Sequence, residues 1–153
     1  GAGITPSFST LPAPLMIARV THGGEAFFSF DAMDASTAAP ASFISVAQGI
    51  GAHSGSGIVS LLGYHRKIYI EVEADGPWTI EVIPAIAQER TEQLEFSGEG
   101  DIVTSAFLLK EGRVDVTFAN EAKDSILVHM YPVEGDGYFS AETVVNDVGP
   151  YNG

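Results

Sequence analysis

The sequence predicts an all-β protein, an antiparallel β-sandwich of jelly-roll type with an internal pseudo-repeat of about 99 residues. Short runs of alternating apolar and polar residues recur along the chain, as in strands with one face on a core. Clusters of glycine and proline interrupt these runs at intervals of about 8–12 residues, which is typical of sandwiches and barrels. Hydrophobic residues make up 45% of the chain, enough for a packed core. No long segment has a convincing helix start.

Six segments have the strand pattern, namely residues 15–20, 26–30, 67–74, 78–84, 113–118 and 125–131. We expect residues 67–74 and 78–84 to form a β-hairpin, because an Asp-Gly-Pro turn sequence separates them. In the second strand of that hairpin Trp78 shares a face with Ile80 and Val82, so we expect the only tryptophan to face the core.

These elements divide the 153 residues into four parts. Residues 1–14, rich in proline and serine, form an N-terminal arm, and residues 15–84 form a first β repeat with its closing hairpin. Residues 85–93 are a linker, and residues 94–153 form a second, incomplete β repeat. The two repeats either merge into one sandwich or complete themselves against another chain, in which case unpaired sheet edges would produce a homo-oligomer.

The repeat is expected from two alignments of the chain with itself. Residues 8–30 resemble residues 107–129 at a spacing of 107 − 8 = 99. Further along, Gly51 matches Gly149 and Gly55 matches Gly153, at a spacing of 153 − 55 = 98. Such glycines usually serve a positive φ or a close backbone approach, so we expect these four to be structural. The segment 96–101 occurs only in the second copy and the Trp78 hairpin only in the first.

Three motifs suggest a family, namely Phe96-x-Gly98-x-Gly100-Asp101, Lys110-x-Gly112 and Asn146-x-x-Gly149-x-Tyr151-x-Gly153. They resemble the first part of a β-sandwich repeat found in bacterial and archaeal surface or secreted proteins. Residues 68–80, with Gly63 and Tyr64 before them, are similar to the closing part of that repeat. The resemblance implies a sandwich fold and an accessory module, and it implies no particular chemistry.

The charge of the chain excludes two classes of partner. Seven basic and twenty acidic residues give a net charge of −13, which repels phosphate backbones and anionic lipid surfaces. We therefore expect no nucleic-acid partner. No apolar run approaches the roughly 18 residues that span a bilayer, so we expect no membrane insertion. A protein or a carbohydrate remains as the expected class of partner, and the sequence does not identify which one.

Catalytic patterns are missing from the sequence, and we expect no enzyme. Ser54 adjoins His53, but neighbouring residues on an extended chain point in opposite directions. The chain has no cysteine, and its four histidines, His22, His53, His65 and His129, lack metal-ligand spacing. A glycan-processing enzyme with two carboxylates is a weaker alternative, because no particular pair stands out.

Calcium is the one cofactor for which the sequence offers candidates. Short acidic loops follow corresponding strands of the two copies and hold Asp31, Asp34, Glu134 and Asp136. Carboxylate oxygens are the ligands that Ca²⁺ takes, six to eight at a time. None of these loops has the twelve-residue calcium pattern, and turns favour aspartate in any case.

We therefore expect a non-catalytic β-sandwich binding or structural module of a surface, secreted or accessory protein, located outside the cell or on its surface. The alternative is a subunit of a self-assembling coat, capsid decoration or surface layer, in which incomplete copies exchange strands between chains.

Overall fold

A computed structural model of the protein describes residues 3–9, 15–41, 45–60, 67–85, 91–92, 94–109, 111–121, 123–133 and 141–152. The all-β prediction is confirmed: this part of the chain contains strands and no α-helix, and every strand pair is antiparallel. The strands are β1 (Gly3–Ile4), β2 (Phe8–Ser9), β3 (Leu15–His22), β4 (Phe27–Asp34), β5 (Ala47–Ile50), β6 (His53–Ser60), β7 (Lys67–Glu73), β8 (Trp78–Pro84), β9 (Ala119–Asn120), β10 (Ser125–Met130), β11 (Glu142–Val148) and β12 (Tyr151–Asn152).

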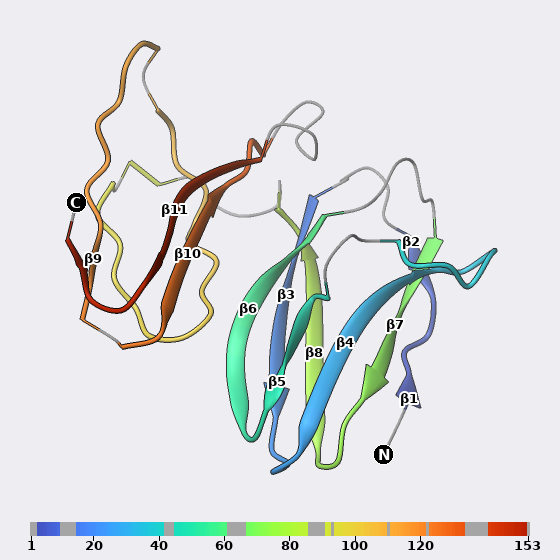
Figure 1. The fold of residues 1–153 in the computed structure, drawn as a ribbon. Helices are drawn as coiled ribbons and strands as arrows, with labels where there is room; N and C mark the ends of the chain where they lie inside the picture. The colour runs from blue at the N-terminus through green and yellow to red at the C-terminus, as the bar shows by residue number, and fades with distance from the viewer. Residues whose placement is uncertain are drawn as a thin grey trace.

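Two sheets from the first part of the chain share one hydrophobic core (Figure 1). One sheet has the order β7-β4-β5, with β1 and β2 paired to the outer edge of β7, and the other has the order β6-β3-β8. Alternate residues of each strand face inward, as the period of two requires. The largest fully buried side chains of this shared core are Phe28, Phe30, Ile68, Ile70, Val20, Val59 and Val72.

The predicted hairpin of residues 67–74 and 78–84 is wrong in its pairing. β7 pairs with β4 and β8 pairs with β3, so the two strands belong to different sheets. The turn between them crosses from one sheet to the other as a β-arch. Both strands carry an apolar face, and placing them in opposing sheets turns both faces onto the same core. Turn sequence alone does not distinguish this crossing from a hairpin.

Part of the expected N-terminal arm belongs to a sheet. Gly3 and Ile4 pair with Val72 and Glu71, and β2 pairs with the start of β7. The amide of Ile70 also donates to Thr5 Oγ1 at 2.9 Å. Residues 10–14 lie outside the described residues, as do 86–90 and 93 of the expected linker.

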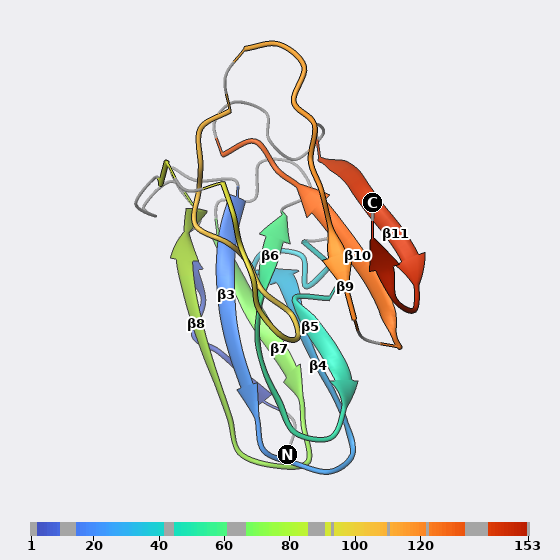
Figure 2. The ribbon, with the colours of Figure 1, turned by 90° about the vertical axis from the view of Figure 1, so that its left-hand side faces the viewer.

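The C-terminal part lies beside the β6 edge and over the outer face of the β6-β3-β8 sheet (Figures 1 and 2). The Ser56 amide donates to the Asp101 carbonyl at 2.8 Å, and the Val103 amide donates to Ser56 Oγ at 2.7 Å. Its strands form two separate pairs, β10 with β11 and β9 with β12. The strand expected at 113–118 is absent, and β9 begins only at Ala119.

Strand registers in the two parts correspond at a constant spacing of 98 residues. The β4–β5 partners Phe27↔Ile50, Phe28↔Gly49, Ser29↔Gln48 and Phe30↔Ala47 correspond to the β10–β11 partners Ser125↔Val148, Ile126↔Asp147, Leu127↔Asn146 and Val128↔Val145 (125 − 27 = 148 − 50 = 98). The β3–β6 partners His22↔His53 correspond to the β9–β12 partners Asn120↔Tyr151 at the same spacing. These registers match at a spacing of 98 residues, whereas the alignment of residues 8–30 with residues 107–129 has a spacing of 99. We call β3–β8 the first unit and residues 113–152 the second unit.

The same glycine turn leads out of β5 and out of β11. Gly51 has φ of 86° and donates its amide to the Ala26 carbonyl at 3.0 Å. Gly149 has φ of 89° and donates its amide to the Asp124 carbonyl, also at 3.0 Å. A side chain with a β-carbon is strained at such a φ, which accounts for glycine at both places.

Candidate functional site

The outer face of the β6-β3-β8 sheet has an apolar end and a polar end. At the apolar end Leu15, Ile17 and Ala85 are buried beneath the C-terminal part, where Val103 and Tyr131 pack on them. At the polar end, where the C-terminal part leaves the sheet uncovered, the outward residues of β3 are Arg19 and Thr21. The sheet face that remains accessible is therefore hydrophilic.

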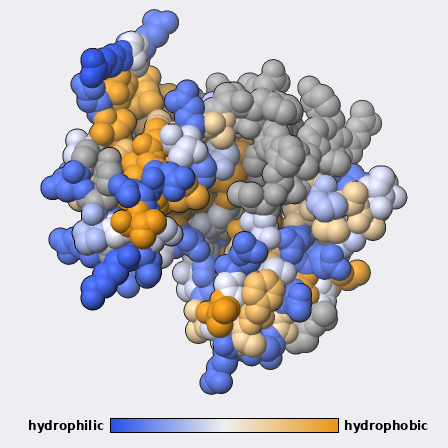
Figure 3. Space-filling model, in the orientation of Figure 1, coloured by the Kyte–Doolittle hydropathy of each residue, from blue (hydrophilic) through white to orange (hydrophobic). Residues whose placement is uncertain are grey.

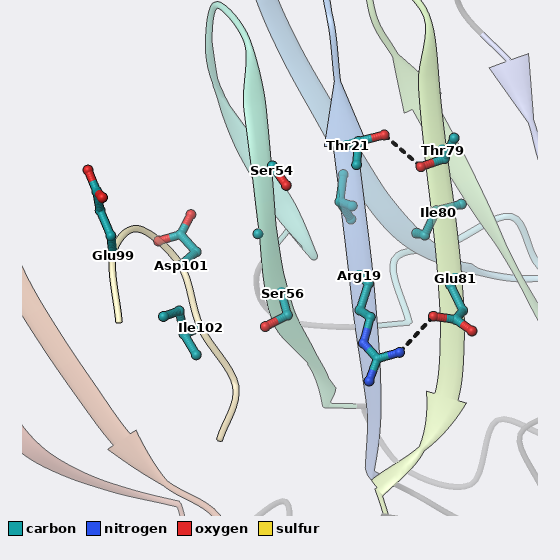
Figure 4. A pocket seen from close by; sticks show the side chains of 12 residues that line it. Arg19, Thr21, Ser54, Ser56, Thr79, Ile80, Glu81, Glu99, Asp101 and Ile102 are labelled. Atoms are coloured by element: carbon teal, nitrogen blue, oxygen red, sulfur yellow. Dashed lines mark hydrogen bonds and ion pairs between the residues drawn. The ribbon is translucent and has the colours of Figure 1, made fainter. Parts of the chain in front are cut away.

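An open groove of about 520 Å³ runs over this polar end (Figure 4). Its floor is formed by the three strands of the sheet. One wall is the segment that includes Glu99, Asp101 and Ile102, which passes along β6. Gly55 permits this approach, because a β-carbon there would lie 2.9 Å from the Asp101 carbonyl oxygen.

Most polar groups on the floor of the groove interact with one another. The Arg19 guanidinium lies 3.0 Å from Glu81 Oε2, and the hydroxyls of Thr21 and Thr79 lie 2.6 Å apart (Figure 4). Ser56 Oγ accepts the Val103 amide, so it holds the wall in place. The groove thus offers hydroxyls and exposed carboxylates for hydrogen bonding.

A second polar cluster holds the turn of the β7–β8 arch. His22 is buried, and its Nδ1 donates to the Gly51 carbonyl at 2.9 Å. Its Nε2 lies 3.0 Å from Asp75 Oδ1 without the alignment of a hydrogen bond. Asp75 Oδ2 accepts the amides of Ala26 and Glu25, each at 2.9 Å. These two amide hydrogen bonds, that of Ala26 first, lower the pKa of Asp75 below its ordinary value of 3.8.

The calcium candidates do not come together in the described residues. Asp34 Oδ1 accepts hydrogen bonds from the amides and hydroxyls of Ser36 and Thr37, so this carboxylate closes its own turn. Asp31 lies within β4, opposite Glu71 of β7. Glu134 and Asp136 lie outside the described residues. No group of three or more histidine, aspartate or glutamate side chains suited to a metal occurs where side chains are described.

The tryptophan and three of the four glycines that we expected to be structural lie in the described part of the chain. Trp78 packs edge-on against Phe30, with ring centroids 5.8 Å apart, and borders the core. Gly51 and Gly149 have positive φ, and Gly55 meets the Asp101 segment. Gly153 lies outside the described residues.

Sequence reasoning missed the groove and the role of Asp75. Alternation within β3 was a usable signal, because Arg19 and Thr21 flank the buried Val20 and must face outward. Their partners Glu81 and Thr79 come from about 60 residues away, and only the β3–β8 register brings them together.

Comparisons with known proteins identify no relative. No protein-family model matches the chain, and no curated protein or solved structure matches it at a significant level. Where the chain is described, no helix has the length and apolar character needed to cross a membrane.

Proposed function

We propose that the protein is a non-catalytic β-sandwich module, built from two copies of one motif, that acts by binding another macromolecule. The sandwich assignment is supported by the core that the two sheets of the first unit share. Duplication is supported by the matched registers of β4–β5 with β10–β11 and of β3–β6 with β9–β12.

The observation that carries the binding function is the exposed apolar surface of the C-terminal part (Figure 3). Its exposed large apolar side chains are Leu94, Phe96, Ile102, Leu108, Leu109, Val114, Val116, Leu127 and Val148. Contiguous apolar patches are unusual on monomeric soluble proteins and mark sites of interaction. The favoured partner is therefore a protein, and the polar groove is a less specific surface.

A non-catalytic role is supported by what the polar side chains do. Ser56 Oγ accepts a backbone amide, His22 hydrogen-bonds the Gly51 carbonyl, and Asp75 accepts two backbone amides. Each of these groups stabilises the fold through its contacts. A place in a surface, secreted or accessory protein is part of the proposal and rests on the motif resemblance.

The alternative is a subunit of a self-assembling coat, capsid decoration or surface layer. It is favoured by strand edges in the second unit, because in the described part of the chain β10 pairs only with β11 and β9 only with β12. Open edges are sites for pairing with another chain.

The test combines bis-ANS fluorescence with sedimentation equilibrium. We expect saturable bis-ANS binding that decreases in the Val116→Asp variant, and a mass that stays monomeric as concentration rises. A mass that increases with concentration supports the assembly alternative. If bis-ANS does not bind, the apolar surface is not accessible and the binding function is overturned.

A further inference from the structure

His22 places a titratable ring inside the first unit. It is the last residue of β3, its side chain is 0% exposed, and its ring lies 4.6 Å from that of Phe28, centroid to centroid. A polar group that is buried in this way is stable only when its neighbours satisfy it. The neighbours of the two ring nitrogens therefore determine which protonation state the fold favours.

Both ring nitrogens of His22 face oxygen atoms that accept hydrogen bonds. Nδ1 lies 2.9 Å from the Gly51 carbonyl oxygen, and Nε2 lies 3.0 Å from Asp75 Oδ1. A carbonyl and an ionised carboxylate only accept, whereas a neutral imidazole has a single N–H to donate. When Nδ1 donates to Gly51, a neutral ring turns the lone pair of Nε2 toward a carboxylate. An imidazolium carries a hydrogen on each nitrogen and removes this repulsion.

A proton fits the contact between Nε2 and Asp75 better than a metal ion does. Nε2 is buried and has no hydrogen-bond partner among the described residues, so the attraction that a positive ring gains there is one between charges. Gly24 packs directly over this contact, because a β-carbon there would lie 2.6 Å from Nε2. A metal ion would need both space and a third ligand, and the described side chains form no cluster of three metal-ligating groups.

The charged side chains around His22 come from several elements. Asp75 belongs to the arch, and Glu25 belongs to the turn after β3. His53 is the β6 partner of His22, and its Nδ1 lies 4.0 Å from Asp101 Oδ2 in the C-terminal part. Three of these four neighbours are acids, so their field favours a positive charge on His22.

The equivalent position in the second unit shows what the glycine turn itself requires. Asn120 lies 98 residues after His22, and its Nδ2 donates to the Gly149 carbonyl at 3.2 Å, as Nδ1 of His22 does to the Gly51 carbonyl. One amide donor is thus enough for this turn. The histidine differs from the asparagine by a second nitrogen, which it turns toward Asp75.

We propose that His22 and Asp75 form a pH-sensitive ion pair, in which a doubly protonated His22 holds the turn of the β7–β8 arch and loss of its Nε2 proton above neutral pH weakens that attachment. The folded chain then binds one proton more at this site than the unfolded chain does. Unfolding releases that proton, so the free energy of unfolding falls as pH rises above neutrality. This inference is independent of the binding function proposed above.

Imidazole ¹⁵N NMR spectra of the full chain, labelled with ¹⁵N-histidine, test the protonation state directly. At about pH 8 an ordinary histidine is neutral, so the exposed His129 should show one bare nitrogen. We expect His22 to show two protonated nitrogens at this pH, and to lose the Nε2 proton in the Asp75→Asn variant. A bare Nε2 in wild-type His22 at this pH would overturn the proposal.

Urea unfolding between about pH 7 and 9 tests the effect on stability. We expect the unfolding equilibrium constant of wild type to rise by up to about tenfold per pH unit, the slope for one released proton. His22→Asn keeps a donor for the Gly51 carbonyl and should lack this additional slope, whereas the exposed control His129→Asn should retain it. Parallel profiles for wild type and His22→Asn would contradict the ion pair.

A zinc titration separates the proton from a metal ion. We expect added Zn²⁺ to leave the unfolding midpoints of wild type and His22→Asn unchanged. Stabilisation of wild type alone would make a metal ion the occupant of the contact and overturn the proposal. The NMR measurement on wild type remains a complete test if the His22→Asn variant does not fold.

Discussion

Asp75 lies against His22 where the β7–β8 arch crosses from one sheet of the first unit to the other. The carboxylate contacts the buried imidazole at 3.0 Å and accepts the amides of Ala26 and Glu25. The turn of the arch is thereby attached to the turn that joins β3 to β4. One side chain thus joins two of the connections that change sheet, the turn from β3 to β4 and the arch from β7 to β8.

The first prediction concerns the pH dependence of this attachment. Because the folded-state pKa of Asp75 is lowered, its stabilisation is complete above the ordinary pKa of 3.8 and is lost as pH falls through the folded-state value. Asp75→Asn should therefore unfold more easily than wild type at neutral pH, and the difference should close in acid. Urea unfolding across a pH series measures this. Glu73→Gln, an exposed change two residues away, serves as the control and should produce no such convergence.

The second prediction compares equivalent positions in the two units. Phe30→Ala removes a side chain that is 0% exposed and should lower the free energy of unfolding by about 3–5 kcal/mol. Val128→Ala, 98 residues further on and half-buried, should cost about 1 kcal/mol. Denaturant unfolding of both variants measures these two losses in the free energy of unfolding. Equal losses would contradict the difference in burial between these two positions.

The third prediction concerns the two glycine turns. Neither Gly51 nor Gly149 has an atom within 4 Å of an added β-carbon, so the cost of alanine comes from the backbone alone. Each substitution by alanine should cost about 1–2 kcal/mol. Asparagine tolerates positive φ better, so Gly51→Asn should lose less stability than Gly51→Ala in thermal unfolding. The reverse order would show that the φ of this turn is not what selects glycine.

The fourth prediction tests how the C-terminal part is attached to β6. Ser56→Ala removes the acceptor of the Val103 amide and keeps the backbone hydrogen bond to Asp101. Exchange of the Val103 amide should accelerate, at a cost of about 1 kcal/mol in global stability. Ser54→Ala, two residues earlier on the same strand, is the control. Unchanged exchange at Val103 in the Ser56 variant would show that other contacts hold the segment.

Local patterns in the sequence predict strands well and their neighbours poorly. Alternation in residues 67–74 correctly indicates a strand, and Ile68, Ile70 and Val72 on its apolar face are buried. The following Asp-Gly-Pro turn does not reveal which sheet the next strand joins, because hairpins and arches use similar turn residues. That choice depends on non-local packing against β3 and β4.

Residues 113–118 illustrate the other limit. They alternate as well as β7 does, yet they form no strand, because backbone pairing needs a neighbour and none is present in the described part of the chain. The candidate groove has the same dependence on partners distant in sequence, since Arg19 meets Glu81 only through the β3–β8 register. Residue type and period are local properties, whereas pairing is set by the whole fold.

The crossing at the β7–β8 arch also constrains how the first unit folds. β3 pairs with β8 and β4 with β7, so each sheet requires closure of a loop of several tens of residues before its central strand has both neighbours. The short turn then forces β7 and β8 to arrive together, which couples completion of one sheet to completion of the other. We expect slow, all-or-none folding kinetics for this unit, as in other proteins with high contact order.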